Sequence, residues 1–321
     1  AMLTATIGGM VAIIASGAPL AAALIPLFVG FLAWMSIATL RTTVTAENVH
    51  IQMGIIGPSI PIDCIAGTSM GSLVGGVYAA GVPIDEITER LEAIDWNDLF
   101  TDDPPRKEKP FRAKRDDFEN LFRLELGQRG TDLLMSSGST AGYKFEFLLR
   151  EMVAGAGNFA DQDFDRLAIP YRATATNIED GTTKEFRRGD LVKAMRASMS
   201  VPGAIAPVEI DGKLYVDGGL LQNLPVAAAR TACADRVIVV NVGSGLLSRD
   251  ELDSAVAISL QMINVLMEQN VRASIASLGP DDILIEPRLG NFSSANFSDA
   301  MPLVAVGEAA ARSRADALRT L

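Results

Sequence analysis

The sequence is poor in the residues that build metal centres and disulfide frameworks. It has one histidine, His50, and two cysteines, Cys64 and Cys233, which lie far apart in apolar surroundings. Without a cluster of Cys and His, the ligand spacing of a zinc site is absent, so we expect neither a metal nor another cofactor. Two distant cysteines do not make a disulfide framework, and we expect two separate buried thiols.

The chain also lacks a surplus of basic charge. Its 28 Lys and Arg residues are outnumbered by 39 Asp and Glu residues, which gives a formal net charge of −11. A protein that binds nucleic acid needs cations to neutralise the phosphates, so we exclude nucleic acid as the main partner. The acidic balance does not exclude a membrane surface as a partner.

Charge is missing altogether from residues 1–40. The stretch from Pro19 to Leu40 is long enough to cross a bilayer as a helix, and Trp34 near its end suits a membrane interface. No basic residue precedes it, which is unlike a secretory signal. We therefore predict that residues 1–45 form an apolar membrane anchor and that the protein is membrane-associated, or cytoplasmic without that anchor. A buried core segment and a stretch that is not native to the domain remain alternatives.

From residue 60 onward, apolar strand-like runs alternate with helical patterns. This alternation is typical of an α/β fold with a largely parallel sheet that helices cover on both faces. The run at 236–242 has the continuous apolar character of a strand buried on both faces. The expected strands are 60–66, 167–176, 236–242 and 283–286, and the expected helices are 71–81, 83–95, 140–153, 190–198, 250–277 and 304–318.

A Gly-x-Ser-x-Gly turn, Gly67-Thr68-Ser69-Met70-Gly71, joins the first of these strands to the first of these helices. A strand, this turn and a helix together make a nucleophile elbow, in which the serine hydroxyl stands exposed at a strained corner. We expect Gly67 and Gly71 to be glycine because the helix passes close to the strand and leaves little room for a Cβ. Ser69 is the candidate nucleophile.

A serine hydroxyl needs a base to take its proton. The histidine of an α/β hydrolase follows its serine in the chain, whereas His50 precedes Ser69, so the base is expected to be a carboxylate. Asp217 stands out among the acidic residues. Asp211-Gly212 predicts a two-residue hairpin, and the returning strand delivers Asp217 to the turn Asp217-Gly218-Gly219. The alternative is that this Asp-Gly-Gly sequence is simply a second turn.

The serine turn and the Asp-Gly-Gly turn together resemble the patatin-like phospholipase family. Further segments resemble the family in the same order: Pro61-Ile62-Asp63, Ala173-Thr174-Ala175-Thr176-Asn177, Arg196 to Gly203, and Leu220 to Pro225. The resemblance covers residues 60–245 most fully and implies one hydrolase domain over residues 46–321 with a three-layer α/β fold.

By this resemblance Ser69 is the nucleophile and Asp217 its base, in a Ser-Asp dyad that hydrolyses fatty acyl esters through an acyl-enzyme. The implied substrate is a phospholipid or another acyl ester at a membrane surface, and no cofactor is implied. Ser198 and Ser200 are interpreted as structural.

One family feature is absent. The glycine-rich loop that forms the oxyanion hole would fall near Leu40 to Thr45, where there is no glycine. The backbone N–H of Met70, at the start of the elbow helix, remains as an oxyanion donor. Three explanations stay open: an oxyanion hole rebuilt differently, a protein that has lost catalysis and serves as a lipid-binding or scaffold protein, and a misread frame upstream of residue 60.

Overall fold

A computed structural model of the chain divides it into two compact units, residues 1–62 with 319–321 and residues 63–318. The structure describes residues 40–44, 49–53, 59–99, 107–108, 110–111, 126–129, 132–135, 138–156, 162–243, 245–290 and 301–320. The predicted anchor at 19–40 therefore lies outside the described residues, except for Leu40. Among the described residues no helix is both long and apolar enough to span a bilayer.

The first unit contains a small antiparallel sheet of three strands. These are β1 (Leu40–Val44), β2 (Val49–Met53) and β3 (Ser59–Pro61). His50 lies in β2. The segment near Leu40 to Thr45, where a glycine-rich loop was sought, is thus a strand over its first five residues.

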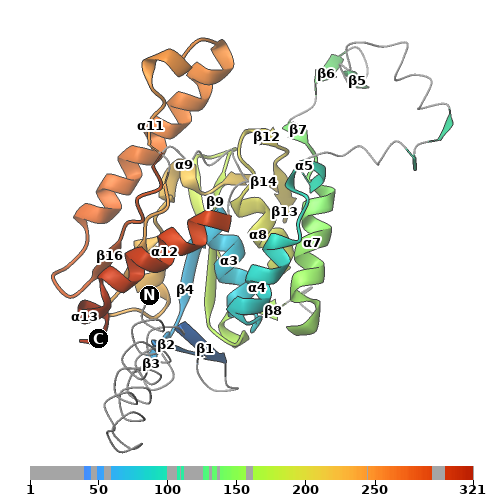
Figure 1. Ribbon diagram of the computed structural model, residues 1–321. Coiled ribbons are helices and arrows are strands. Elements are labelled where there is room, and N and C mark those ends of the chain that lie inside the picture. The colour runs from blue at the N-terminus through green and yellow to red at the C-terminus, as the bar shows by residue number, and fades with distance from the viewer. Residues whose placement is uncertain are drawn as a thin grey trace, which may run out of the picture. The chain divides into compact units, whose positions relative to one another are not determined.

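The second unit has the predicted α/β architecture, and strand β9 (Tyr171–Asn177) is the axis of its largest sheet (Figure 1). All seven residues of β9 are buried. Strand β4 (Ile65–Thr68) pairs with it in parallel, whereas β10 (Thr182–Phe186) and β14 (Lys213–Asp217) pair with it in antiparallel. Strand β13 (Val208–Ile210) continues the sheet beyond β14 through the predicted hairpin.

The pairing register brings two strand ends together on one edge of β9. Strand β10 pairs with residues 173–177 and so occupies the other edge. Strands β4 and β14 share the remaining edge end to end, with Thr68 opposite Thr174 and Asp217 opposite Ala175. The carboxyl ends of these two strands therefore meet at adjacent register positions, although they are 149 residues apart (217 − 68) in the chain.

Helices cover both faces of β9, because successive side chains of a strand point to opposite faces. Helix α3 (Met70–Ala79) crosses one face so closely that a Cβ on Gly76 would lie 3.1 Å from the Tyr171 ring and 2.5 Å from Met195 of α8 (Leu191–Ser198). On the other face Thr174 reaches toward α9 (Gly219–Gln222) through Thr68. These layers enclose the strand ends just described.

The remaining elements follow the predicted alternation, with helices slightly shorter than expected. The helices are α4 (Ile84–Glu92), α5 (Trp96–Leu99), α7 (Tyr143–Val153), α10 (Val226–Ala232), α11 (Ala255–Ala276), α12 (Met301–Ser313), α13 (Ala315–Leu318) and the 3-10 turns η1 (Ala154–Ala156), η2 (Phe164–Arg166) and η3 (Arg249–Glu251). The remaining strands are β5 (Leu126–Arg129), β6 (Asp132–Met135), β7 (Gly138–Thr140), β8 (Gln162–Asp163), β11 (Arg188–Gly189), β12 (Gly203–Ile205), β15 (Ile238–Val240) and β16 (Ile283–Ile285).

Strand β15 corrects one prediction. It pairs in parallel with β16, as an α/β fold requires, but within the described residues it has a partner on one side only. Val240 is 50% exposed and Val242 is 51% exposed, whereas Val239 is buried. The prediction that residues 236–242 are buried on both faces is therefore wrong at the carboxyl end of the strand.

The two cysteines correct another prediction. Cys64, just before β4, and Cys233, at the carboxyl end of α10, form a disulfide with a Cα–Cα distance of 6.2 Å. Cys64 is only partly buried and Cys233 is exposed. The expectation of two separate buried thiols is wrong because the fold places β4 beside α10, and a sequence separation of 169 residues hides that proximity.

Candidate active site

Ser69 occupies the strained corner that the sequence predicts. It lies between β4 and α3 with φ of 53° and ψ of −126°, a left-handed φ that is uncommon for any residue other than glycine. A Cβ on Gly67 would lie 2.3 Å from the carbonyl oxygen of Gly71, so the expected glycine requirement is confirmed there. Gly71 differs, because a Cβ on it would meet nothing within 4 Å. The expectation of crowding at Gly71 is wrong, since this residue faces solvent on the first turn of α3.

A buried serine of another helix holds the backbone of the corner. The N–H of Ser69 donates to Oγ of Ser198 over 2.9 Å, and Ser198 is fully buried at the end of α8. The carbonyl of the same Ser198 accepts the N–H of Gly218 over 3.3 Å. Ser198 therefore connects the serine turn to the Asp-Gly-Gly turn, which agrees with its interpretation as a structural residue.

Asp217 lies at the end of β14 and is only 4% exposed. Its backbone N–H donates to the carbonyl of Ser200 over 2.9 Å, which gives Ser200 a structural role as well. The carboxylate accepts two hydrogen bonds, one from the hydroxyl of Ser69 and one from the N–H of Gly219 over 2.7 Å. The structure thus brings the two predicted residues, Ser69 and Asp217, into direct contact.

The glycines of the Asp-Gly-Gly turn are required by close packing. A Cβ on Gly218 would lie 2.3 Å from the carbonyl oxygen of Thr174 on β9. A Cβ on Gly219 would lie 2.9 Å from both Asn223 and Met267 and 3.0 Å from the Asp217 carboxylate. The turn is therefore wedged between β9 and α11, and this fixes the direction of the carboxylate.

Burial sets the protonation chemistry of the pair. Removal from water raises the pKa of Asp217 from 3.8 to about 6, and the hydrogen bonds from Gly219 and Ser69 lower the pKa against this effect. A carboxylate with a pKa near neutrality is a better proton acceptor than an exposed one and is still ionised above that pH. The arrangement therefore suits Asp217 to accept the proton of Ser69.

Two threonines beside the pair were not singled out by the sequence. The hydroxyls of Thr68 and Thr174 lie 2.5 Å apart, and that of Thr68 donates to the carbonyl of Gln222 over 2.7 Å. These bonds join the end of β4 to β9 and to α9, on either side of Asp217. Thr68 lies within the serine turn, which is the one sequence signal that would have pointed to it.

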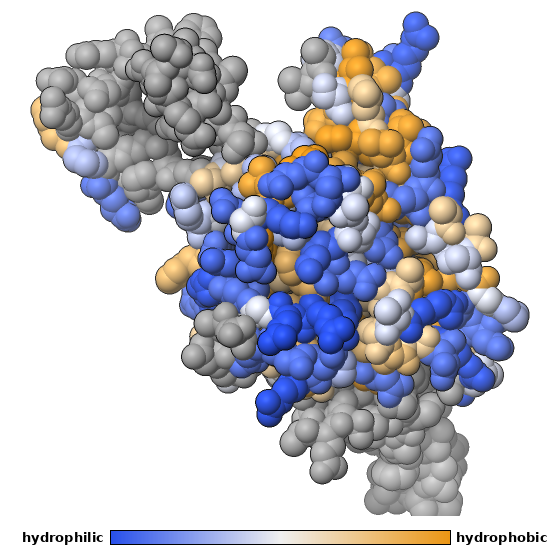
Figure 2. Space-filling view, turned by 180° about the vertical axis from the view of Figure 1, so that it is seen from behind, coloured by the Kyte–Doolittle hydropathy of each residue, from blue (hydrophilic) through white to orange (hydrophobic). Residues whose placement is uncertain are grey.

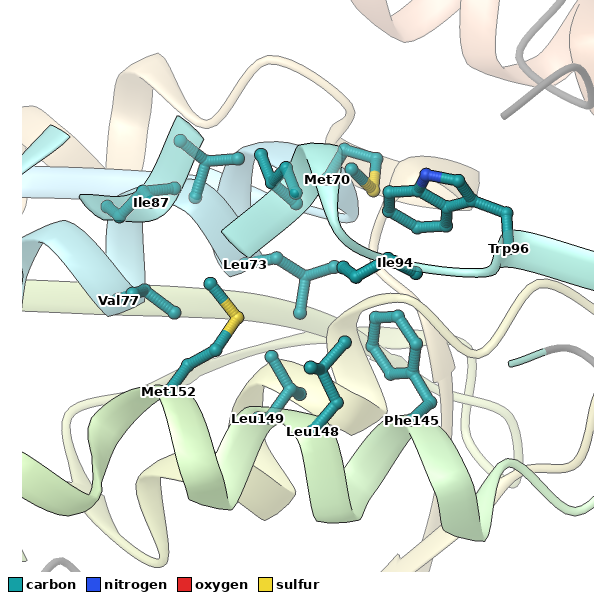
Figure 3. A pocket seen from close by; sticks show the side chains of 12 residues that line it. Met70, Leu73, Val77, Ile87, Ile94, Trp96, Phe145, Leu148, Leu149 and Met152 are labelled. Atoms are coloured by element: carbon teal, nitrogen blue, oxygen red, sulfur yellow. The ribbon is translucent and has the colours of Figure 1, made fainter. Parts of the chain in front are cut away.

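A small apolar cavity begins at the residue after the nucleophile (Figure 3). Four residues of α3 line it, Met70, Leu73, Val74 and Val77, and the other lining residues come from α4, the α4–α5 segment and α7, all of them hydrophobic. In Figure 3, Met70 and Trp96 lie toward one end, and Val77 toward the other. The cavity volume is only about 20 Å³, so a longer apolar ligand requires its walls to separate.

The described residues contain no group of three His, Cys, Asp or Glu side chains placed to hold a metal ion. Met70 is the first residue of α3, so its backbone N–H faces the corner at the amino end of a helix. A buried carboxylate, a serine at a strained corner and a helix N-terminus together suit the attack of a hydroxyl on a carbonyl carbon.

Comparison with known proteins places these residues in context. A model of the family described as patatin-like phospholipase matches residues 30–230. An uncharacterised NTE family protein of Mycobacterium tuberculosis is 33% identical over 178 residues, which cover 56% of this chain and 40% of that protein. The lysophospholipase NTE1 of Saccharomyces cerevisiae is 30% identical over 199 residues, which cover 62% of this chain and 10% of that protein.

A third relative is the patatin-like phospholipase domain-containing protein 7 of Rattus norvegicus, 29% identical over 210 residues that cover 63% of this chain. The match covers 13% of that protein. The chain thus spans two fifths of the mycobacterial relative and a much smaller part of the yeast and rat proteins.

Proposed function

Because the chain belongs to the patatin-like phospholipase family, we propose that it is a serine acyl hydrolase that cleaves fatty acyl esters of phospholipids or lysophospholipids. The observation that carries the proposal is the hydrogen bond from the Ser69 hydroxyl to the buried carboxylate of Asp217. Similarity to the yeast lysophospholipase supports the class of substrate. The proposed setting is a membrane surface, where such substrates are presented.

In the first half of the reaction, Asp217 accepts the proton of Ser69 while Oγ attacks the carbonyl carbon of the ester. The tetrahedral intermediate carries its negative charge on the former carbonyl oxygen, toward which the Met70 N–H points from the start of α3. Collapse of the intermediate breaks the bond to the alcohol oxygen, which takes the proton from Asp217. The acyl group remains on Ser69.

In the second half, Asp217 accepts a proton from water, and the resulting hydroxide attacks the acyl carbon. The bond to Oγ breaks, Ser69 regains its proton from Asp217, and the fatty acid leaves. No step requires a metal or an added cofactor. The apolar cavity that begins at Met70 supports an acyl chain as the group beside the reacting carbon.

The test combines an active-site probe with lipid turnover. A fluorophosphonate probe is expected to label the protein, and Ser69→Ala is expected to abolish both labelling and the hydrolysis of micellar lysophosphatidylcholine. Asp217→Asn is expected to reduce turnover by about 10²- to 10⁴-fold, because it removes the proton acceptor. Ser277→Ala is the matched control, since Ser277 is exposed on the far end of α11. A wild-type protein that neither labels nor hydrolyses lipid would refute the proposal.

A second candidate function is that of a lipid-binding or scaffold protein without catalysis. The observation in its favour is that β1 occupies the place where the glycine-rich oxyanion loop was expected, and β1 contains no glycine. Loss of one oxyanion donor typically costs about 10²- to 10³-fold in rate. This alternative predicts that Ser69→Ala and Asp217→Asn leave lipid binding unchanged and that the wild type has no turnover to lose.

A further inference from the structure

Helix α11 has an unusual first half. Its 22 residues start at Ala255, and the chain has no charged residue between Asp253 and Glu268. No residue from 257 to 267 is buried. Five large apolar side chains stand out in water, and together we call them the α11 face: Ile258 (51% exposed), Leu260 (42%), Met262 (65%), Val265 (37%) and Leu266 (52%).

The polar side of this half-helix points inward, which is the reverse of the usual amphipathic pattern. The side chain of Gln261 donates to the carbonyl of Leu247 over 3.2 Å and accepts its N–H over 2.9 Å. A helix on the surface of a globular protein normally turns its apolar side inward and its polar side to water. Figure 2 shows apolar atoms gathered over this part of the molecule, at the upper right of the view.

The second half of α11 is held firmly by the body. Val271 is buried in a cluster with Val237 and Val239, and Ser274 donates to the carbonyl of Leu224 over 2.9 Å. The first half extends beyond this anchor (Figure 1). The α11 face is therefore a projecting surface on a fixed base, and it is not a loose end of the chain.

The fixed base lies directly behind the Asp-Gly-Gly turn. The amide of Asn270 donates to the carbonyl of Gly219 over 2.8 Å and accepts the N–H of Asn223 over 2.8 Å. The N–H of the same Gly219 donates to the carboxylate of Asp217. The α11 face begins one turn before Asn270, so whatever covers this face lies beside the Ser69–Asp217 pair.

The charges around the α11 face decide what kind of surface it fits. The face itself is uncharged, and the segment before it carries Arg249 against Asp250, Glu251 and Asp253. An anionic surface would be repelled by this acidic edge, and no cluster of Lys or Arg is present there to attract one. An assembly of neutral lipid offers apolar contact without that repulsion.

We propose that the α11 face docks on the surface of neutral, zwitterionic lipid and so holds the Ser69–Asp217 pair at the layer that contains its substrate. This inference rests on the proposed function for the substrate. It adds the element of the chain that meets the lipid.

The test measures how the full chain partitions onto phosphatidylcholine vesicles by flotation. The double variant Met262→Gln/Leu266→Gln is expected to lower the bound fraction at least tenfold. The matched control, Ile178→Gln/Val304→Gln, removes two equally exposed apolar side chains (49% and 51% exposed) elsewhere and is expected to bind like the wild type. Equal binding by the wild type and the α11 double variant would overturn the inference.

Two further measurements keep the outcome interpretable. Hydrolysis of a water-soluble butyrate ester reports whether each variant has folded with an intact site, so an active wild type that ignores vesicles refutes the inference while the proposed function survives. An inactive wild type that binds vesicles through α11 refutes the proposed function instead. Met262→Trp keeps the face apolar, and its indole emission is expected to shift to the blue when vesicles are added.

A second copy of the chain is the rival occupant of the α11 face. Light scattering in the absence of lipid distinguishes it, because a self-association surface makes the wild type dimeric and the Met262→Gln/Leu266→Gln variant monomeric. That result would overturn the lipid assignment.

Discussion

Asp217 carries two opposing demands at the scale of one residue, because the burial that makes it basic also opposes its charge. Its pKa of about 6 lies above its ordinary value of 3.8. As a proton acceptor it must be ionised, so we expect kcat/KM for a neutral ester to rise with pH and to level off above pH 6. A pH–rate profile from 4 to 9 measures this. A profile whose acid limb lies at pH 4 would contradict the role of burial.

The same shift predicts a cost in stability. In the unfolded chain Asp217 ionises near pH 3.8, whereas in the folded protein it ionises near pH 6. Stability is therefore lost as pH rises through this window, on the order of 3 kcal/mol for a shift of about two units. Asp217→Asn keeps an acceptor for the N–H of Gly219 and removes the charge. We expect it to raise the urea midpoint at pH 8 but not at pH 3.5, and equal gains at both values would count against this explanation.

Residues near the site differ in how far the sequence reveals them. Ser69 and Asp217 were predicted because each follows a strand and stands in a short glycine turn, which are local patterns. Ser198 was noticed, but its bond to the Ser69 N–H was not foreseeable, since it depends on where α8 ends against the elbow. Thr174 contributes through its place opposite Thr68, a pairing that no local pattern contains.

At the scale of elements, helix α3 links the nucleophile to the apolar cavity. Its first residue, Met70, follows Ser69, and Val74 lines the cavity one turn later. The sequence predicted this helix from its small residues and the elbow before it. The cavity was not predicted, because its other walls come from α4 and α7, whose packing against α3 depends on the tertiary fold.

Filling this cavity is expected to change the preference for acyl chain length. Val74→Phe adds a ring where the acyl chain of a substrate is proposed to lie, so kcat/KM for a dodecanoyl ester should fall about tenfold relative to an acetyl ester, a difference of about 1.4 kcal/mol. Ile178→Phe, at a half-exposed site outside the cavity, is the control and should leave the ratio unchanged. An unchanged ratio in Val74→Phe would exclude the cavity as the acyl site.

The meeting of β4 and β14 on β9 shows what strand prediction alone leaves undecided. The hairpin at Asp211-Gly212 was predicted and is present, with φ of 53° and 72° at its two residues. What joins Asp217 to Ser69, however, is that both strands use the same edge of β9 and stop at neighbouring positions. That choice of edge is a property of the assembled sheet.

At the scale of the whole molecule, the disulfide between Cys64 and Cys233 constrains most of the site-bearing unit. A cross-link over 169 residues removes conformational freedom chiefly from the unfolded chain. We expect Cys64→Ser/Cys233→Ser to lose about 2 to 5 kcal/mol of unfolding free energy, measured by urea denaturation. Reductant should lower the midpoint of the wild type and leave that of the double variant unchanged. Identical midpoints for the two oxidised proteins would show that the bond contributes nothing.

The disulfide also decides what happens to a chain that is cut. Cys64 and Cys233 enclose both Ser69 and Asp217, so the closed loop contains the entire candidate dyad. A single peptide bond hydrolysed anywhere between these cysteines leaves one covalent molecule, which separates into two fragments only in the presence of reductant. A preparation that runs as one band without reductant can therefore contain nicked chains in which Ser69 and Asp217 sit on different polypeptides.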